Sequence, residues 1–148
     1  KEYLKQIVIS FKETSNKNFI LNFDNDQNPK KITKSIEIVY GLRNFIGNAN
    51  KFSNTSIFIS LKSDNKFSEI IIEDDGKGYS NDIMSKIGEP YLKSNSQSDK
   101  KNSGLGLGIF IGKTLLEKNF ATIYFGNSLT RSGAQVIIKW KNKDLFNI

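Results

Sequence analysis

The feature that most constrains the fold is a long amphipathic segment, residues 33–52, which reads TKSIEIVYGLRNFIGNANKF. At about 100° per residue, its apolar side chains fall in one narrow stripe of a helix. These side chains are Ile38, Leu42, Phe45, Ala49 and Phe52. Because such a stripe has to be buried against another layer of structure, the segment predicts a helix that packs on the core.

The rest of the chain supplies the second layer. Apolar runs with strand-like patterns predict strands at 18–23, 56–62, 68–74, 121–127 and 134–140. Helical spacing predicts further helices at 1–13 and 105–118, and a short one at 81–87. Residues 24–31 and 92–103 are expected to be loops. About three main helices and five strands predict an α/β (α+β) two-layer sandwich with the helices on one face of the sheet.

The composition excludes several classes of function. The 148-residue chain has no cysteine and no histidine, which excludes disulfides, thiolate metal sites and a histidine base. No apolar run approaches the ~18 residues that a membrane helix needs. We expect a single domain and, because the chain starts at Lys1 rather than Met, a piece of a larger protein. Its net charge of +7 comes from scattered lysines, so we expect an anionic ligand and no nucleic acid.

The polar flank of the long helix is a first candidate site. Asn44, Asn48 and Lys51 are spaced i, i+4 and i+7, so their side chains line up beside the apolar stripe. An amide oxygen can bind Mg²⁺, and a nearby lysine can reach a phosphate. The alternative interpretation is an ordinary solvated helix face.

A second candidate follows the strand at 68–74. Asp74 stands at the end of that strand, and Gly76 and Gly78 come directly after it. A carboxylate only accepts hydrogen bonds, so it suits an exocyclic amine such as adenine N6. The alternative is a turn that contains glycine.

The third candidate is NSGLGLGIFIG, residues 102–112, with glycines at 104, 106 and 108. A glycine-rich turn that opens a helix favours an anion, because the first N–H groups and the helix dipole both attract negative charge. The spacing does not match the GxGxxG fingerprint of dinucleotide sites or the Walker A loop. This phosphate site is therefore predicted to be of another kind.

The three candidate segments follow one another along the chain, and a proline–aromatic turn at residues 89–91 lies between the second and the third. Together they resemble the N, G1, F and G2 boxes of histidine kinase catalytic domains. These domains belong to the gyrase, Hsp90, histidine kinase and MutL ATP-binding superfamily. The resemblance covers residues 35–140, and the segments GEPYLKS and GLGLGIFIGKTLLEKNFA are most similar to the RegB/PrrB redox-sensing kinases. It implies a Bergerat-type fold with a mixed sheet, with ATP and Mg²⁺ as cofactors. Residues 1–148 would form the catalytic and ATP-binding domain, without a phosphoacceptor domain.

The resemblance also implies roles for the residues of the long helix. Asn48 would be the Mg²⁺ ligand, and Asn44 would lie close to the metal and the phosphates. Lys51 would contact phosphate, and Phe52 would form a wall of the nucleotide site. Asn44, Asn48 and Lys51 are thus the implied catalytic residues.

Further roles are implied for the two glycine-rich segments. Asp74 would bind adenine N6, with Gly76 and Gly78 allowing close approach, and Ile87 and Leu107 would pack against the base. Residues 92–103 would form the lid over the nucleotide. The implied lid and phosphate contacts are Lys100, Lys101, Gly104, Leu105, Gly106, Leu107 and Gly108.

Five positions depart from the family pattern. Gly47 stands where an acidic or amide residue is common, and glycine inside a helix costs ~1 kcal/mol relative to alanine. Lys100 and Lys101 replace a lid arginine and so lack its bidentate fork. Ala134 stands where a hydroxyl residue is frequent. Asn44 replaces the glutamate that activates water in the ATP-hydrolysing members, and an amide cannot serve as that base.

The resemblance therefore favours a kinase module over a hydrolase. It implies that the domain donates the ATP γ-phosphoryl group to a histidine on a separate dimerisation domain, for relay to a response regulator. The parent would be a homodimeric, inner-membrane-anchored bacterial sensor with this domain in the cytoplasm, and the fragment would be monomeric. The alternatives are a non-catalytic nucleotide-binding or protein-interaction module, and an anti-sigma-type serine kinase of the same superfamily.

Overall fold

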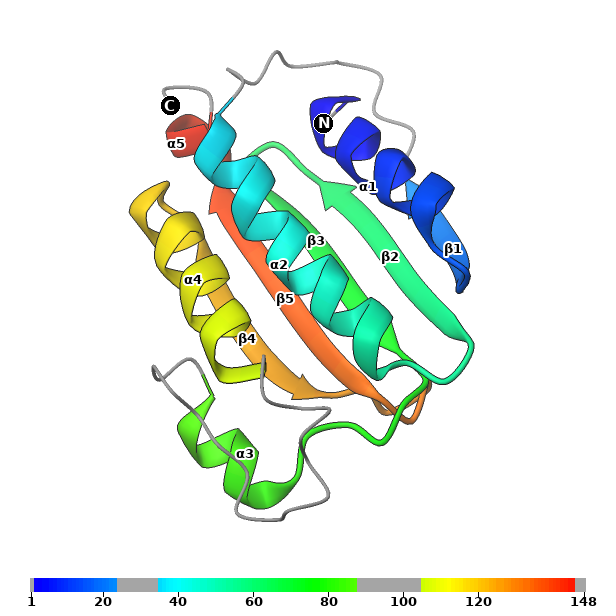
Figure 1. Cartoon of the computed structure of the whole chain (residues 1–148). Helices are drawn as coiled ribbons and strands as arrows, with labels where there is room; N and C mark the ends of the chain where they lie inside the picture. The colour runs from blue at the N-terminus through cyan, green and yellow to red at the C-terminus, as the bar shows by residue number, and fades with distance from the viewer. Residues whose placement is uncertain (1, 24–34, 88–104, 146–148) are drawn as a thin grey trace.

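The computed structural model describes residues 2–23, 35–87 and 105–145 (Figure 1). A five-stranded sheet has the order β1-β2-β3-β5-β4. β1 and β2 are parallel and the other neighbours are antiparallel, so the expected mixed sheet is confirmed. The strands are β1 (Asn18–Phe23), β2 (Ser56–Ser63), β3 (Phe67–Asp74), β4 (Thr122–Asn127) and β5 (Ala134–Lys141).

Three helices cover one face of this sheet, which confirms the two-layer sandwich (Figure 1). They are α1 (Glu2–Thr14), α2 (Ile36–Phe52) and α4 (Leu105–Lys118). The short helices α3 (Asn81–Lys86) and α5 (Asn142–Leu145) lie at opposite ends of the sheet. The sequence did not predict α5. Within the described ranges, no helix combines the length and apolarity of a membrane span.

The apolar stripe of α2 is buried against the sheet as predicted. Ile38 and Leu42 are fully buried, and Phe45 and Ala49 nearly so, whereas Phe52 is only partly buried. The opposing sheet residues alternate along their strands and are Ile57, Ile59, Leu61, Ile70, Ile72, Val136, Ile138 and Trp140. Burying one such side chain contributes roughly 1.5–3 kcal/mol relative to leaving it in water, so this interface is the main source of stability.

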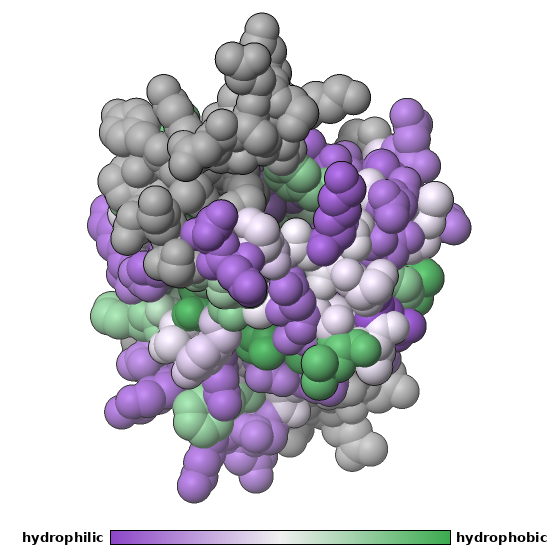
Figure 2. All heavy atoms as spheres, turned by 90° about the horizontal axis from the view of Figure 1, so that it is seen from below, coloured by the Kyte–Doolittle hydropathy of each residue, from purple (hydrophilic) through white to green (hydrophobic). Residues whose placement is uncertain are grey.

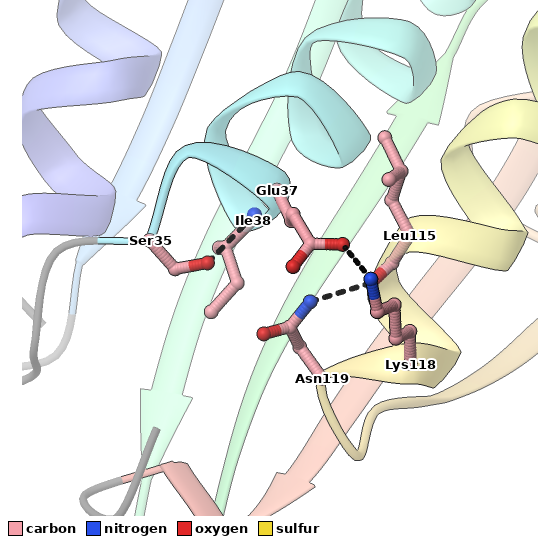
Figure 3. A network of polar contacts seen from close by, with 6 residues as sticks. All are labelled: Ser35, Glu37, Ile38, Leu115, Lys118 and Asn119. Carbon is pink, nitrogen blue, oxygen red and sulfur yellow. Dashed lines mark hydrogen bonds and ion pairs between the residues drawn. The ribbon is translucent and has the colours of Figure 1, made fainter.

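α2 and α4 approach closely and run antiparallel. A Cβ added to Gly41 would lie 2.6 Å from Leu116 Cγ, and one added to Gly112 would lie 3.1 Å from the Gly41 carbonyl oxygen. Where α2 begins and α4 ends, Lys118 Nζ lies 3.1 Å from Glu37 Oε2 (Figure 3). The end of α2 therefore lies beside the start of α4.

The start of α2 is set by a side-chain cap. Ser35 Oγ accepts a hydrogen bond from the Ile38 N–H at 3.4 Å (Figure 3), which satisfies one of the free donors of the first turn. The helix expected from residue 33 therefore begins at Ile36. The expected loops at 24–31 and 92–103 lie outside the described residues.

Candidate functional site

The polar flank of α2 faces the first turns of α4. Asn44 Nδ2 donates a hydrogen bond to the Tyr40 carbonyl oxygen at 2.8 Å, so its Oδ1 is left to face other groups. A Cβ added to Gly108 would lie 3.6 Å from that Oδ1. Asn48 follows one turn later on the same flank and is partly buried. Asn44 thus lies beside the start of α4, with Asn48 one turn further along α2.

Lys51 and Phe52 end the same helix. Lys51 is exposed, and its Nζ lies 5.4 Å from the centroid of the Phe52 ring. This distance permits a cation–π contact that holds the lysine near the ring. The charge of Lys51 therefore stays close to the C-terminal end of α2.

Asp74, the last residue of β3, is a buried carboxylate that is 3% exposed. Its Oδ1 accepts hydrogen bonds from the backbone N–H groups of Gly76 at 2.9 Å and Ala134 at 3.3 Å. Burial raises the pKa of Asp74, the two N–H donors oppose that rise, and the charge of Asp75 adds to it. Among the described residues, both bonds use Oδ1, so Oδ2 is the atom that remains for a ligand.

Glycines surround Asp74 because a side chain would collide with the protein. A Cβ on Gly76 would lie 2.2 Å from the Phe52 carbonyl oxygen, and one on Gly133 would lie 2.1 Å from Asp74 Oδ1. Packing inside the protein is therefore one reason for the bare backbone at position 76, and its contact with a nucleotide stays a prediction. The sequence predicted no role at this site for Gly133 or for the Ala134 N–H.

Asp75 ties the loop after β3 to the connection between α2 and β2. Its carboxylate accepts hydrogen bonds from the N–H groups of Asn54, Thr55 and Ser56 at 2.8, 3.1 and 3.2 Å, and from Thr55 Oγ1 at 2.8 Å. Burial opposes ionisation, but these bonds prevail and lower the pKa of Asp75 to about 2. No role was predicted for Asp75 from the sequence, although an aspartate before a glycine is a common loop anchor.

Some of the remaining predicted residues lie within the described ranges and the others lie outside them. Ile87 follows α3 and packs against the core, while Leu107 and Gly108 lie in the first turn of α4, with Leu107 49% exposed. Leu105 and Gly106 are the first residues of that helix. Lys100, Lys101, Gly104 and the proposed lid at 92–103 lie outside the described residues.

Three elements thus meet at one end of the molecule, the lower end in Figure 1. The contact of Gly76 with Phe52 joins the loop after β3 to α2, and the approach of Gly108 to Asn44 joins α4 to α2. Figure 2 views this end, and among its coloured residues small hydrophobic areas are separated by hydrophilic ones. The carboxylate of Asp74, at the end of β3, is buried.

A helix-covered mixed sheet with a buried strand-end carboxylate, helix amides and a glycine-rich helix start defines a Bergerat-type domain. The chain belongs to the histidine kinase-, DNA gyrase B-, and HSP90-like ATPase family, whose model matches residues 33–144. The resemblance inferred from the boxes is confirmed.

Sensor histidine kinases are among the relatives in sequence. The chain is 34% identical over 108 residues to sensor histidine kinase RegB of Cereibacter sphaeroides, a match that covers 70% of this chain and 23% of RegB. It is 30% identical over 78 residues to sensor histidine kinase CpxA of Escherichia coli K12, covering 53% of this chain and 17% of CpxA. The match spans about a quarter or less of each of these relatives, and the chain is homologous to their catalytic domains.

Solved structures share the fold. The mycobacterial sensor histidine kinase MprB superposes with a TM-score of 0.70 at 18% identity, covering 95% of this chain and 93% of that one. A nucleotide-free catalytic domain of histidine kinase ThkA gives 0.73 at 18% identity, with 95% and 92% covered. Full-length ShkA in complex with AMPPNP gives 0.69 at 20% identity, with 93% and 28% covered.

Proposed function

We propose that this domain binds Mg-ATP and donates the γ-phosphoryl group to a histidine on a separate dimerisation domain. From there the group passes to an aspartate of a response regulator. The observation that carries the proposal is Asp74, a buried carboxylate with one oxygen fixed by two backbone donors, within a member of this ATPase family. The parent protein is a homodimeric bacterial sensor kinase anchored in the inner membrane, with this domain in the cytoplasm.

Recognition of the base rests on Asp74. Its Oδ2 accepts a hydrogen bond from the exocyclic N6 amine of adenine, a donor that guanine lacks at the equivalent position. Hydrogen bonds to a charged acceptor are roughly twice as strong as neutral ones, and burial of Asp74 strengthens the bond further. The arrangement therefore favours adenine nucleotides.

Recognition of the phosphates rests on α2 and α4. Among the described residues there is no group of three acidic side chains that could hold a metal, so Mg²⁺ would take most of its ligands from phosphate and water. Asn48, with Asn44 beside it, would supply amide oxygen, and the first N–H groups of α4 favour the anion. The ion would neutralise the charge of the triphosphate.

Transfer rather than hydrolysis is favoured by Asn44. An amide is not a base at neutral pH, so this position does not activate water. Phosphoryl transfer depends mainly on positioning and charge stabilisation, and its nucleophile can come from another domain. The chain has no histidine of its own, which is why the acceptor is assigned to a separate domain.

A second candidate function is a nucleotide-binding or interaction module without catalysis, and Gly47 favours it. The position next to Asn48 carries no side chain to move a proton. A Cβ there would point toward α1 and lie 3.5 Å from Phe11 Cζ. An anti-sigma-type serine kinase of the same superfamily is a further alternative. Whether a histidine or a serine accepts the phosphoryl group decides between these two kinds of kinase.

Calorimetric titration with ATP in the presence of Mg²⁺ tests the proposal. Asp74→Asn is expected to weaken ATP binding by about 10- to 100-fold, because a hydrogen bond to a charged group contributes roughly 1.5–3 kcal/mol. Asn48→Asp is expected to change the dependence of binding on Mg²⁺ concentration. Asn65→Asp, an exposed change in the turn between β2 and β3, is the matched control and is expected to bind like the unmodified domain.

Equal ATP affinities for the unmodified domain, Asp74→Asn and Asn48→Asp would contradict the proposal. That result would favour the interaction module, because the residues assigned to the nucleotide would then have no part in binding.

A further inference from the structure

Asn127, at the end of β4, bonds both backbone polar groups of Tyr79. Its Oδ1 accepts a hydrogen bond from the Tyr79 N–H at 2.7 Å, and its Nδ2 donates one to the Tyr79 carbonyl oxygen at 3.0 Å. This pair of bonds resembles the pairing between two strands, although Tyr79 lies in the loop between β3 and α3. One side chain therefore fixes that loop to the end of β4.

These two hydrogen bonds between Asn127 and Tyr79 form a clamp, which lies two strands away from Asp74. Asn127 is paired with Ala134 across β4 and β5, and the Ala134 N–H donates to Asp74 Oδ1 at 3.3 Å. The loop leaves β3 after Asp74 and is held by Asn127 at β4, with β5 between them. The loop of residues 75–79 therefore crosses the end of β5 and is anchored on both sides.

Two neighbours restrict the loop to this position. Gly78 has φ of 75°, and a Cβ there would lie 2.6 Å from Asn127 Oδ1, so only glycine fits beside the clamp. Tyr79 is buried, with its ring edge-on to Phe125 at a centroid distance of 6.4 Å. The amide of Asn127 and the ring of Tyr79 thus hold the same short segment.

We propose that Asn127 is a positioning residue for the base site, which holds the 75–79 loop in register with Asp74 and thereby sets the selectivity for adenine. The inference rests on the proposed function, since it takes Asp74 as the acceptor for the base. A loop that is already fixed does not have to be ordered when the ligand binds, so the affinity is not reduced by that cost. Without the clamp, the loop moves relative to Asp74 and the discrimination between bases weakens.

The test compares Mg-ATP with Mg-GTP by calorimetry on the 148-residue chain. Asn127→Ala is expected to lower the ATP affinity about tenfold, as for loss of a fixed hydrogen-bonding contact, and to reduce the ratio of ATP to GTP affinity. Asn127→Asp keeps the acceptor for the Tyr79 N–H and is expected to restore part of that ratio. Asn127→Asp also serves as the test variant if Asn127→Ala does not fold.

A matched control lies at the other end of the sheet. Asn142 is a buried asparagine whose Nδ2 donates to the Asp64 carbonyl oxygen at 2.8 Å and whose Oδ1 accepts from Ser68 Oγ at 2.6 Å. Asn142→Ala therefore removes a similar loop anchor far from Asp74. It is expected to lower the melting temperature without changing the ratio of ATP to GTP affinity.

Two results would overturn the inference in distinguishable ways. If the unmodified chain binds ATP and the folded Asn127 variants keep its ratio of ATP to GTP affinity, Asn127 is only a structural residue and the proposed function stands. If the unmodified chain does not bind ATP, the proposed function fails and this inference fails with it.

Discussion

Asp74 and Asp75 are neighbours in the sequence, yet the pKa values of their carboxyl groups shift in opposite directions. Burial at the end of β3 raises the pKa of Asp74, whereas hydrogen bonds from residues 54–56 lower the pKa of Asp75 to about 2 despite its burial. The first residue faces the candidate site and the second anchors the loop. The sequence predicted a ligand-binding role for Asp74, because a strand-end carboxylate before glycines is a recognisable pattern, and that role stays a prediction.

Replacement of Asp74 by asparagine is expected to stabilise the fold at pH 7. The pKa of the folded state lies above the ordinary value of 3.8, so the folded state holds the proton more tightly than the unfolded chain. Stability is then lost as the pH rises from 3.8 through the raised pKa. Asparagine carries no charge, and its Oδ1 can still accept from Gly76 and Ala134.

Urea unfolding at pH 3 and pH 7 measures this effect. The gain in the free energy of unfolding from Asp74→Asn should be larger at pH 7 than at pH 3, in the same variant that is expected to bind ATP less tightly. A loss of stability that is greater at pH 7 would show that the charge of Asp74 supports the fold.

Residues whose partners are distant in the sequence were not predictable from local patterns. Asn127, Gly133 and Asp75 have partners 19 to 59 residues away in the sequence, and only Asp75, which stands before a glycine, carries a local signal. Their roles depend on which strands lie side by side. The tight fit of Gly133 against Asp74 is visible only once β5 is next to β3.

At the scale of elements, α2 shows how one helix serves both the core and the site. Its apolar stripe is buried, and its neighbouring flank carries Asn44 and Asn48. Two glycines on the same helix have different surroundings: Gly41 faces Leu116 of α4, and Gly47 faces Phe11 of α1. Only the first is required for close packing of helices.

These two glycines form a matched pair for mutation. Gly47→Ala is expected to stabilise the domain by up to ~1 kcal/mol, because alanine favours the helix and its Cβ would lie 3.5 Å from Phe11 Cζ, an ordinary contact. Gly41→Ala gains the same propensity but would place its Cβ 2.6 Å from Leu116 Cγ, and overpacking costs about 1–3 kcal/mol.

Chemical denaturation of both variants gives the two free energies of unfolding. Since the change in helix propensity is common to both, their difference isolates the packing of α2 on α4. Equal stabilities would mean that Leu116 moves aside without cost, and would contradict the close helix contact.

Element boundaries were largely predictable because apolar periodicity fixes them. The strand at 18–23 and the helix at 105–118 have the expected bounds, and the other strands differ by one residue at an end. α5, residues 142–145, was missed because a helix of four residues has too few positions to show a period. The start of α2 came later than expected because Ser35 caps it.

At the scale of the whole molecule, the layers were predictable and the order of strands was not. Counting helices and strands gave the two-layer sandwich, whereas the order β1-β2-β3-β5-β4 depends on pairings between distant segments. That order places β3 beside β5 and brings Ala134 to Asp74. The candidate site is therefore a product of the topology.

The isolated chain is expected to acquire no phosphohistidine. It contains no histidine, so a histidine that accepts the phosphoryl group would have to lie in another domain. Incubation with γ-labelled ATP should give no acid-labile, base-stable phosphate on residues 1–148. Detection of such a phosphate would contradict the assignment of the acceptor to a separate domain.

The convergence of three elements on one magnesium nucleotide is tested most directly by NMR. Addition of Mg-AMPPNP to the ¹⁵N-labelled chain should shift the backbone amide signals of Asn48, Gly76 and Gly108 together, with one common dissociation constant, while the amide of Asn142 at the opposite end stays in place. Shifts confined to a single one of these elements, or different dissociation constants for α2, the loop after β3 and α4, would contradict it.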